Sequence, residues 1–190
     1  MNEAGIDEAG RGALAGPVVA ACVFLNEAIP GLGDSKTIPP ARRKALVKCI
    51  YSSTAQVGVG VMGAAEVDKL GIVEATMRAM GLAWQAAGLP KEVLVVIDGN
   101  DSPKIPAPMR PIPKADRDHK AVGAASLVAK VSRDAIMHGL DKRWSGYGLG
   151  VHMGYGTERH RRAIEEKGPT PCHRRSFRPV AFSLLVGGGA

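Results

Sequence analysis

Cysteine, aromatic residues and long apolar runs are all scarce in this chain of 190 residues. Its three cysteines, Cys22, Cys49 and Cys172, lie far apart and form no C-x-x-C pair, which argues against a disulfide framework or a cysteine zinc site and fits a reducing compartment. The uncharged stretch Gly12–Leu25 contains Pro17 and follows an acidic segment. It is too short to cross a bilayer as a helix and lacks the basic start of a signal peptide. The sequence therefore predicts a cytoplasmic protein that is not bound to a membrane.

The basic residues are unevenly distributed along the chain. The formal net charge is +7 at pH 7, yet residues 1–95 contain nine basic and nine acidic side chains. Residues 96–190 contain sixteen basic and nine acidic side chains, together with all five histidines. Such an asymmetry points to a polyanionic partner, nucleic acid before a membrane surface. On charge alone, a basic protein without such a partner remains the alternative.

Apolar periodicity predicts strands that alternate with helices. We expect strands at Gly5–Glu8, Pro17–Leu25, Ala55–Met62 and Glu92–Gly99, and helices at Pro39–Ser53, Ala65–Ala87, Ala121–Trp144 and Thr157–Lys167. The segment Pro103–Pro113 is typical of an extended sheet edge, and Pro171–Pro179 is expected to be irregular and basic. This pattern indicates an α/β fold with helices on both faces of a sheet, without an internal repeat.

One glycine motif matches a nucleotide-binding pattern without its context. Gly58-x-Gly60-x-x-Gly63 runs through an expected strand, whereas a dinucleotide-binding loop forms the turn after a strand. The chain has no G-x-x-x-x-G-K-[ST] phosphate loop, and His152 and His160 are too far apart in sequence for a zinc-ligand pair. We therefore reject a dinucleotide cofactor.

Acidic residues stand at the ends of several expected strands. Asp7 and Glu8 end the first strand, Asp98 ends the strongest one, and Asp116 follows the extended edge segment. Any one of these acids is better explained as a cap on a turn. Together they predict a cluster of carboxylates, whose mutual repulsion a cation relieves and whose hard oxygens select Mg²⁺ or Mn²⁺. An acidic cluster beside a basic flank is typical of a metal-dependent nuclease.

The segment around the first acids carries a family resemblance. Its glycines allow backbone amides to approach a phosphate or sugar, and Arg11 adds a planar cation. The chain resembles the type 2 ribonucleases H, the ribonuclease HII family, in its bacterial form. The resemblance rests on ordered motifs: D-E-A-G-R-G-x-x-x-G-P-V from Asp7, Gly33-Asp34-Ser35-Lys36, Ile97-Asp98-Gly99-Asn100, Lys114-x-Asp116, Ala124–Asp134, Gly154-Tyr155-Gly156-Thr157-x-x-His160 and His173–Pro179.

This resemblance implies a fold, a domain organisation and an activity. The fold would be a ribonuclease H-like mixed five-stranded sheet flanked by helices. Residues 1–145 would form the catalytic domain, and residues 146–190 a small basic substrate-binding extension packed on it. A monomer of this kind would hydrolyse the RNA strand of RNA/DNA hybrids. It would also cut 5′ to a single ribonucleotide in duplex DNA, leaving a 3′-hydroxyl and a 5′-phosphate.

The resemblance also implies a set of site residues. The Mg²⁺ or Mn²⁺ ligands would be Asp7, Glu8, Asp98 and Asp116. Gly10, Arg11 and Gly12 would read the ribose 2′-hydroxyl, Tyr155 would stack on the next sugar, and Lys36, Ser126 and Lys130 would contact phosphates. General attraction to the duplex would come from exposed basic clusters: Arg159, Arg161, Arg162, Arg174 and Arg175. The family usually has Lys-Gly-Asp where this chain has Ala115 before Asp116, and Asp118 offers a second acid nearby.

Two other functions remain open at this point. The chain could be a hybrid-binding module without catalysis, but a pure binder gains nothing from four carboxylates that face a polyanion. It could also be a type 3 ribonuclease H, which normally has an extra N-terminal domain and a glutamate as the last ligand. The position of Asp7 near the start and the aspartate at position 116 make that alternative weaker.

Overall fold

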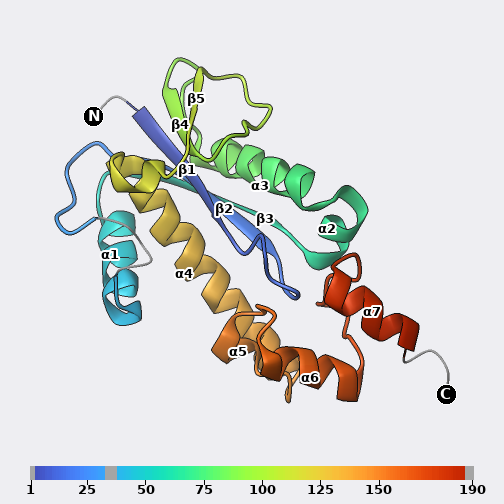
Figure 1. Cartoon of the computed structure of the whole chain (residues 1–190). Coiled ribbons are helices and arrows are strands. Elements are labelled where there is room, and N and C mark those ends of the chain that lie inside the picture. The colour runs from blue at the N-terminus through green and yellow to red at the C-terminus, as the bar shows by residue number, and fades with distance from the viewer. Residues whose placement is uncertain (1–2, 33–37, 187–190) are drawn as a thin grey trace.

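A computed structural model describes residues 3–32 and 38–186 of the chain. Within those ranges five strands form one mixed sheet in the order β3-β2-β1-β4-β5 (Figure 1). Antiparallel pairing joins β1 to β2 and β2 to β3, and parallel pairing joins β1 to β4 and β4 to β5. The strands are β1 (Glu3–Ala9), β2 (Val18–Phe24), β3 (Gln56–Met62), β4 (Leu94–Asp98) and β5 (Met109–Ile112). The expected mixed five-stranded sheet is confirmed.

The central strand β1 carries the first two acids. It is hydrogen-bonded on one side to β2 and on the other to β4, so its backbone is fixed along most of its length. The register pairs Ile6 with Ile97, and the next residue on each strand is Asp7 and Asp98 respectively. Rigid neighbouring strands therefore bring acids that are far apart in the sequence to one end of the sheet.

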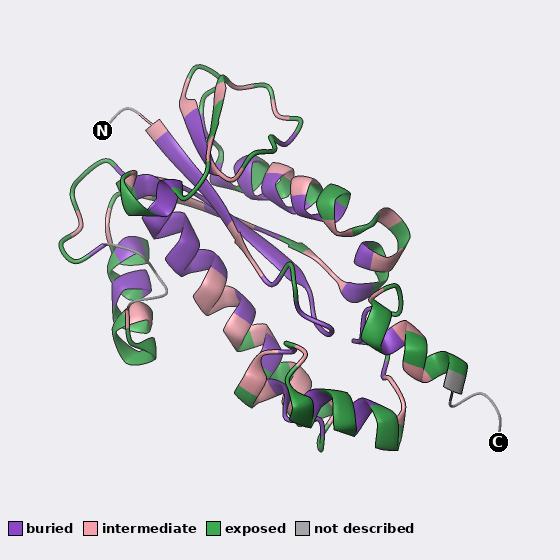
Figure 2. Cartoon of the chain, in the orientation of Figure 1, coloured by how far each residue is buried: buried purple, intermediate pink, exposed green. Residues whose placement is uncertain are grey.

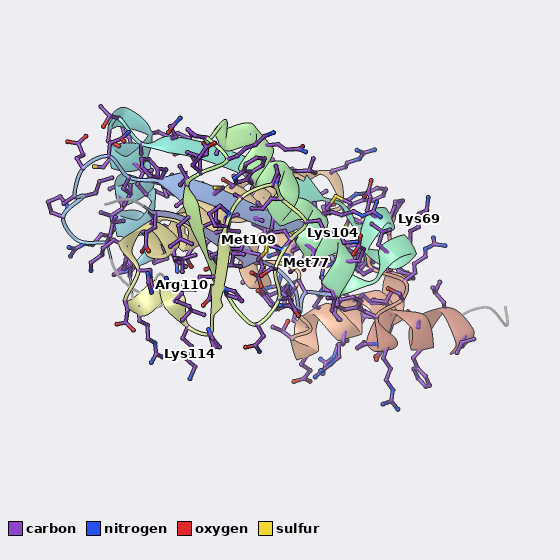
Figure 3. The ribbon with its side chains drawn as sticks, turned by 90° about the horizontal axis from the view of Figure 1, so that it is seen from above. Lys69, Met77, Lys104, Met109, Arg110 and Lys114 are labelled. Carbon is purple, nitrogen blue, oxygen red and sulfur yellow. The ribbon has the colours of Figure 1, made fainter. Side chains whose placement is uncertain are left out.

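Helices cover both faces of the sheet, as the sequence predicts. On one face α3 packs on β1, β2 and β3, and on the other face α4 packs on β1 and β2 with α1 beside it (Figures 1 and 2). Met77 of α3 and Met109 of β5, both labelled in Figure 3, pack against the buried cluster that lies between α3 and the sheet. The helices are α1 (Pro40–Ser52), α2 (Ala64–Leu70), α3 (Ile72–Ala87), α4 (Lys120–Arg143), α5 (Leu149–His152), α6 (Glu158–Lys167) and α7 (Arg178–Val186), with a 3₁₀ turn η1 (Ala115–Arg117).

Glycines in the strands allow these helices to pack closely. A Cβ on Gly60 would lie 2.0 Å from the carbonyl oxygen of Ala79 in α3, and one on Gly58 would lie 2.1 Å from that of Ala83. The G-x-G-x-x-G pattern is thus a packing surface within β3, in agreement with the rejection of a nucleotide loop. A Cβ on Gly5 of β1 would likewise lie 2.1 Å from the backbone nitrogen of Val122 in α4.

The predicted elements differ from the structure at three places. The single helix expected at Ala65–Ala87 is broken at Gly71, whose φ of 76° is left-handed. The segment expected to be irregular after Pro171 becomes helical from Arg178. A short helix, α5, forms at Leu149–His152, where no helix is expected from the sequence. Each difference depends on the residues that pack against the segment in the fold. The apolar periodicity of the segment itself carries no information about these neighbours.

The C-terminal region packs against the end of α4. Met137 of α4, Leu149 of α5, Ile164 of α6 and Val180 of α7 belong to one buried cluster. The Asp68 carboxylate of α2 also accepts hydrogen bonds from the backbone nitrogens of residues 175 and 176, both at 2.9 Å. Across the described ranges, none of the helices combines the length and the apolar character needed to cross a membrane.

Candidate active site

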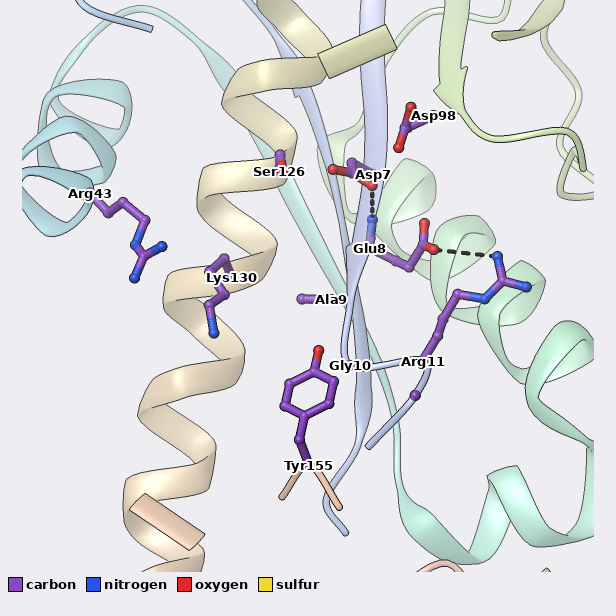
Figure 4. Close-up of a pocket in the computed structure, with 11 residues that line it drawn as sticks. Asp7, Glu8, Ala9, Gly10, Arg11, Arg43, Asp98, Ser126, Lys130 and Tyr155 are labelled. Carbon is purple, nitrogen blue, oxygen red and sulfur yellow. Dashed lines mark hydrogen bonds and ion pairs between the residues drawn. The ribbon is translucent and has the colours of Figure 1, made fainter. Parts of the chain in front are cut away.

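A cavity of about 320 Å³ opens at the end of β1 where the predicted site residues meet (Figure 4). Strand β1 and the loop after it form one wall, α4 forms another, and Tyr155 closes a third side. The lining residues are Asp7, Glu8, Ala9, Gly10, Arg11, Gly12, Arg43, Asp98, Ser126, Lys130 and Tyr155. The structure therefore brings together three of the four expected metal ligands and most of the expected substrate-binding residues.

Asp7 is the most buried acid of the cavity, with 6% of its surface exposed. Its Oδ1 accepts a hydrogen bond of 2.7 Å from the backbone nitrogen of Glu8. Burial raises the pKa of Asp7 well above its usual value, and the charges of Glu8 and Asp98 raise it further. A hydrogen bond from Ser126 of α4 opposes this shift. Ionised Asp7 is therefore held among groups that disfavour its charge unless a cation is present.

Glu8 and Asp98 share this environment. Burial raises the pKa of Glu8, and Arg11 opposes the shift through an ion pair of 3.5 Å between Nη1 and Oε1. The charge of Asp98 raises it again. Asp98 Oδ1 accepts a hydrogen bond of 2.8 Å from the backbone nitrogen of Ala115, which fixes the end of β4 to the 3₁₀ turn. Three carboxylates with restricted orientations therefore face one cavity.

The fourth expected ligand, Asp116, is not among the residues that line the cavity. It belongs to the 3₁₀ turn that is bonded to Asp98, and it is buried. Asp118 is exposed. Among the residues that the structure describes, no three histidine, cysteine or acidic side chains stand close enough to hold a metal ion by themselves. A metal here would need water or substrate oxygens besides the protein ligands.

The Gly-Arg-Gly segment forms the rim beside the acids. Gly10 has a φ of 96°, and a Cβ there would lie 1.9 Å from Nε of Arg133 in α4, so no larger residue fits. The Arg11 side chain is 42% exposed and reaches over the cavity toward Glu8. The Tyr155 ring faces Gly12, since its Cε1 lies 4.0 Å from the position of a Cβ on that glycine. Rim and ring together leave a narrow, partly apolar entrance.

Basic side chains occupy the opposite wall. Lys130 lines the cavity and pairs with Asp134 at 2.7 Å, and Arg43 of α1 lines it as well. Arg43 is absent from the site predicted from the sequence, although it lies one turn before the buried residues Leu46 and Val47 on the same helix face. That helical spacing was the one signal in the sequence that could have placed Arg43 on the side of the helix that faces the fold. The expected phosphate ligand Lys36 lies outside the described residues.

The expected role of one basic cluster is partly wrong. Arg159, Arg161, Arg162 and Arg175 are exposed, as attraction to a duplex requires. Arg174, in contrast, is 0% exposed. Its guanidinium donates to the carbonyl oxygens of the segment after β1 and cannot reach a duplex. Positive charge in a basic segment does not by itself indicate a surface side chain.

The chemistry of the site follows from these groups. Buried carboxylates that raise one another's pKa favour a bound divalent cation, and oxygen ligands suit Mg²⁺ or Mn²⁺. The basic wall and rim favour phosphate groups of a polyanion. An open cavity that combines both can hold a phosphodiester against a metal site.

Comparison with known proteins agrees with this geometry. The family model described as ribonuclease HII matches residues 4–180. A ribonuclease HII of Geobacillus thermodenitrificans is 48% identical over 96% of this chain and 71% of its own. The ribonuclease H2 structure from Pyrococcus horikoshii superposes with a TM-score of 0.83 at 23% identity and covers all of both chains. The structure of the Bst ribonuclease HIII in complex with Mn²⁺ has a TM-score of 0.74 at 20% identity, covering 97% of this chain and 69% of that one.

Proposed function

Because the chain belongs to the ribonuclease HII family and is thus a ribonuclease H endonuclease, we propose that it acts on two related substrates. It hydrolyses the RNA strand of RNA/DNA hybrids, and it cuts 5′ to single ribonucleotides embedded in duplex DNA. Each cut leaves a 3′-hydroxyl and a 5′-phosphate. The observation that carries this proposal is the grouping of Asp7, Glu8 and Asp98 in one cavity rimmed by Gly10–Gly12 and Tyr155.

The acids of this cavity suit Mg²⁺ or Mn²⁺. Asp7 and Glu8 are ionisable groups whose charged forms are disfavoured by burial and by their neighbours, and a divalent cation removes that penalty. Mg²⁺ is usually held by one or two carboxylates together with waters and substrate phosphates, which fits a site without a closed protein cage. When bound, the metal supplies Lewis-acid stabilisation of the reacting phosphate and lowers the pKa of an attacking water. Asp7, Glu8, Asp98 and Asp116 would hold it.

The remaining lining residues would bind the substrate. Gly10, Arg11 and Gly12 read the 2′-hydroxyl, which distinguishes RNA from DNA, and the exposed ring of Tyr155 stacks on the neighbouring sugar. Lys130 contacts phosphate, and the position of Arg43 in the same wall supports a similar role. Ser126 was expected to contact phosphate too, but its hydrogen bond to Asp7 supports a role in orienting that carboxylate. Lys36 keeps its expected phosphate role as a proposal from the sequence.

Domain organisation and cellular setting complete the proposal. Residues 146–190 act as a basic substrate-binding extension packed on the catalytic domain of residues 1–145. The shared cluster of Met137, Leu149 and Ile164 supports their packing as one unit. The enzyme would work as a monomer, as the resemblance to the family implies. Its substrate in cellular DNA implies action in the cytoplasm.

An end-labelled DNA duplex with one ribonucleotide tests the proposal. We expect cutting at the ribonucleotide with Mg²⁺ or Mn²⁺ and none with a chelator. Asp98→Asn should abolish turnover and leave hybrid binding nearly unchanged, because an asparagine oxygen can still accept the hydrogen bond from Ala115.

Two matched variants resolve the fourth ligand. Asp116→Asn should reduce turnover strongly, whereas Asp118→Asn should have no effect, since Asp118 is exposed. Metal-dependent hybrid binding without any cut in the wild-type protein would instead identify a binding module.

A further inference from the structure

The C-terminal segment before α7 runs alongside the segment that follows β1. Residues Ala15 and His173 form an antiparallel bridge. The backbone nitrogen of Arg174 donates to Leu14 O at 2.8 Å, and that of Gly16 donates to Cys172 O at 2.8 Å. Two segments more than 150 residues apart are therefore paired directly behind the rim of the cavity. The proposed function assigns no role to this pairing.

Arg174 lies beneath the Gly-Arg-Gly rim. Its Nη1 donates to Arg11 O at 2.8 Å and its Nε to Gly16 O at 3.0 Å, while its guanidinium carbon lies 5.1 Å from the centre of the Phe177 ring. Burial lowers the pKa of Arg174 to about 10, and the nearby charge of Arg133 contributes. Taking a guanidinium out of water costs several kcal/mol unless hydrogen bonds compensate. Here carbonyl oxygens of the rim segment compensate Nε and Nη1, whereas the buried Nη2 has no hydrogen-bond partner among the described residues.

His173 is linked through His160 to the Tyr155 side of the cavity. Its Nε2 lies 3.1 Å from Nε2 of His160 in α6, and His160 Nδ1 lies 3.0 Å from Tyr155 O. The backbone nitrogen of Thr170 donates to His173 Nδ1 at 3.0 Å. Both rings are fully or almost fully buried. A chain of hydrogen bonds thus links Thr170 to the backbone of Tyr155.

The partners determine the proton positions in this chain. A carbonyl oxygen only accepts, so His160 Nδ1 carries its proton and, in the neutral ring, Nε2 is the acceptor. The Thr170 nitrogen only donates, so His173 Nδ1 accepts and Nε2 carries the proton. Every donor in this hydrogen-bond chain then meets an acceptor. One extra proton on either ring would replace an acceptor nitrogen by a second donor and remove one of these hydrogen bonds. In agreement, burial lowers the pKa of His160 and of His173 to about 4.

We propose that His173 and Arg174 are positioning residues for ribonucleotide recognition, His173 through His160 and the Tyr155 backbone, and Arg174 through the backbone of the Gly10–Gly12 rim. This inference rests on the proposed function, because it assigns the held loops to reading the ribose and the neighbouring sugar. The two loops also bond to each other, since Leu14 N donates to Gly154 O at 2.8 Å. The dipeptide His173-Arg174 therefore fixes the Gly10–Gly12 rim and the Tyr155 loop relative to each other.

The ratio of two dissociation constants tests the proposal. We would measure binding, in chelator, of a DNA duplex with one ribonucleotide and of the same duplex in DNA only. The ratio does not depend on the folded fraction of a variant, so a merely structural role leaves it unchanged. Arg174→Lys keeps the charge but cannot bond both carbonyls, and it should reduce the ribonucleotide preference by about tenfold, the value of one net hydrogen bond.

Substitution of His173 by glutamine and by asparagine distinguishes the hydrogen bond to His160 from the hydrogen bond to Thr170. His173→Gln keeps a donor near the Nε2 position toward His160, whereas His173→Asn keeps only an acceptor toward Thr170. We expect His173→Asn to lower the preference and His173→Gln to retain most of it. In a Tyr155→Ala background, His173→Asn should have no further effect, because its influence passes through Tyr155. The exposed His138, changed to Asn and to Gln, and Arg78→Lys serve as controls.

Three outcomes would overturn the inference. A wild-type preference that Arg174→Lys leaves unchanged would remove Arg174 from a positioning role. Equal effects of His173→Asn and His173→Gln on the ribonucleotide preference, or full additivity of His173→Asn with Tyr155→Ala, would remove His173 from a positioning role. If Arg174→Lys does not fold, the His173 variants alone test the inference. A wild-type protein that binds both duplexes equally would overturn the proposed function, and the inference with it.

Discussion

Asp7 illustrates at the level of one residue how a buried carboxylate of the candidate active site opposes folding. Its carboxyl is buried, it lies beside Glu8 and Asp98, and its pKa is raised well above the usual value. A group whose pKa is raised on folding destabilises the folded state once it ionises. The hydrogen bonds from Ser126 and the Glu8 backbone offset only part of this. The burial of this carboxylate does not serve stability, and this supports the proposal that it binds a cation.

Replacing this carboxylate should therefore stabilise the metal-free protein. We expect Asp7→Asn to increase the free energy of unfolding at neutral pH, because the amide has no charge that burial and the neighbouring acids disfavour. The gain should disappear below the ordinary aspartate pKa of 3.8, where Asp7 is protonated in both states. Urea denaturation in chelator measures this, with the exposed Asp101→Asn as control. A less stable Asp7→Asn at neutral pH would contradict the explanation.

Residue types alone identified only part of the site. The acids and the Gly-Arg-Gly rim are recognisable in the sequence because their chemistry demands those side chains at those places. Arg43 and Arg174 are not, because an arginine is equally at home on a surface, and only the fold shows which one faces the cavity and which one is buried. The carbonyls that accept from Nε and Nη1 of Arg174 belong to Gly16 and Arg11, more than 150 residues earlier in the chain.

At the level of elements, the close contact between β1 and α4 determines how near the helix side chains come to the acids of the strand. Gly5 lies two residues before Asp7, and its missing side chain allows the start of α4 to touch the strand. That close approach carries Ser126, one turn further along α4, to Asp7. A larger residue at position 5 would separate the two elements and weaken that hydrogen bond.

Two glycine-to-alanine changes should therefore act in opposite directions. Gly5→Ala should destabilise the protein by about 1–3 kcal/mol through overpacking and lower its turnover. Gly139→Ala, in α4 with no atom within 4 Å of the new Cβ, should stabilise it by about 0.5–1 kcal/mol through helix propensity and leave turnover unchanged. Thermal or urea unfolding of both variants checks the signs. Stabilisation by Gly5→Ala would show that the packing is looser than described.

Strand and helix periods predicted most of these elements because their residues alternate or repeat with little ambiguity. The break at Gly71 and helix α7 escaped prediction for physical reasons. Glycine is tolerated inside helices, so the left-handed φ of Gly71 depends on the packing of α2 and α3. Helix α7 follows a proline-rich basic stretch, and its exposed Phe182 and Leu185 give no clear buried stripe.

For the molecule as a whole, the buried histidine pair predicts acid sensitivity. Because the pKa values of His160 and His173 fall from 6.5 to about 4 on folding, the unfolded chain takes up protons first as the pH decreases. Stability should therefore be lost progressively from about pH 6.5 to pH 4 and is unaffected by this pair above that range. His173→Gln removes one of the two groups and should show a shallower loss in urea midpoints across that interval. An unchanged slope would exclude the pair as its source.

The pairing of residues 14–16 with residues 172–174 also has a consequence for synthesis on the ribosome. The acids of β1 are synthesised well before residues 172–174, which pair with the segment behind the rim. A nascent chain therefore carries the carboxylates long before it carries an ordered entrance. We expect cutting competence to arise only after residues 172–174 have left the ribosome and can pair with residues 14–16.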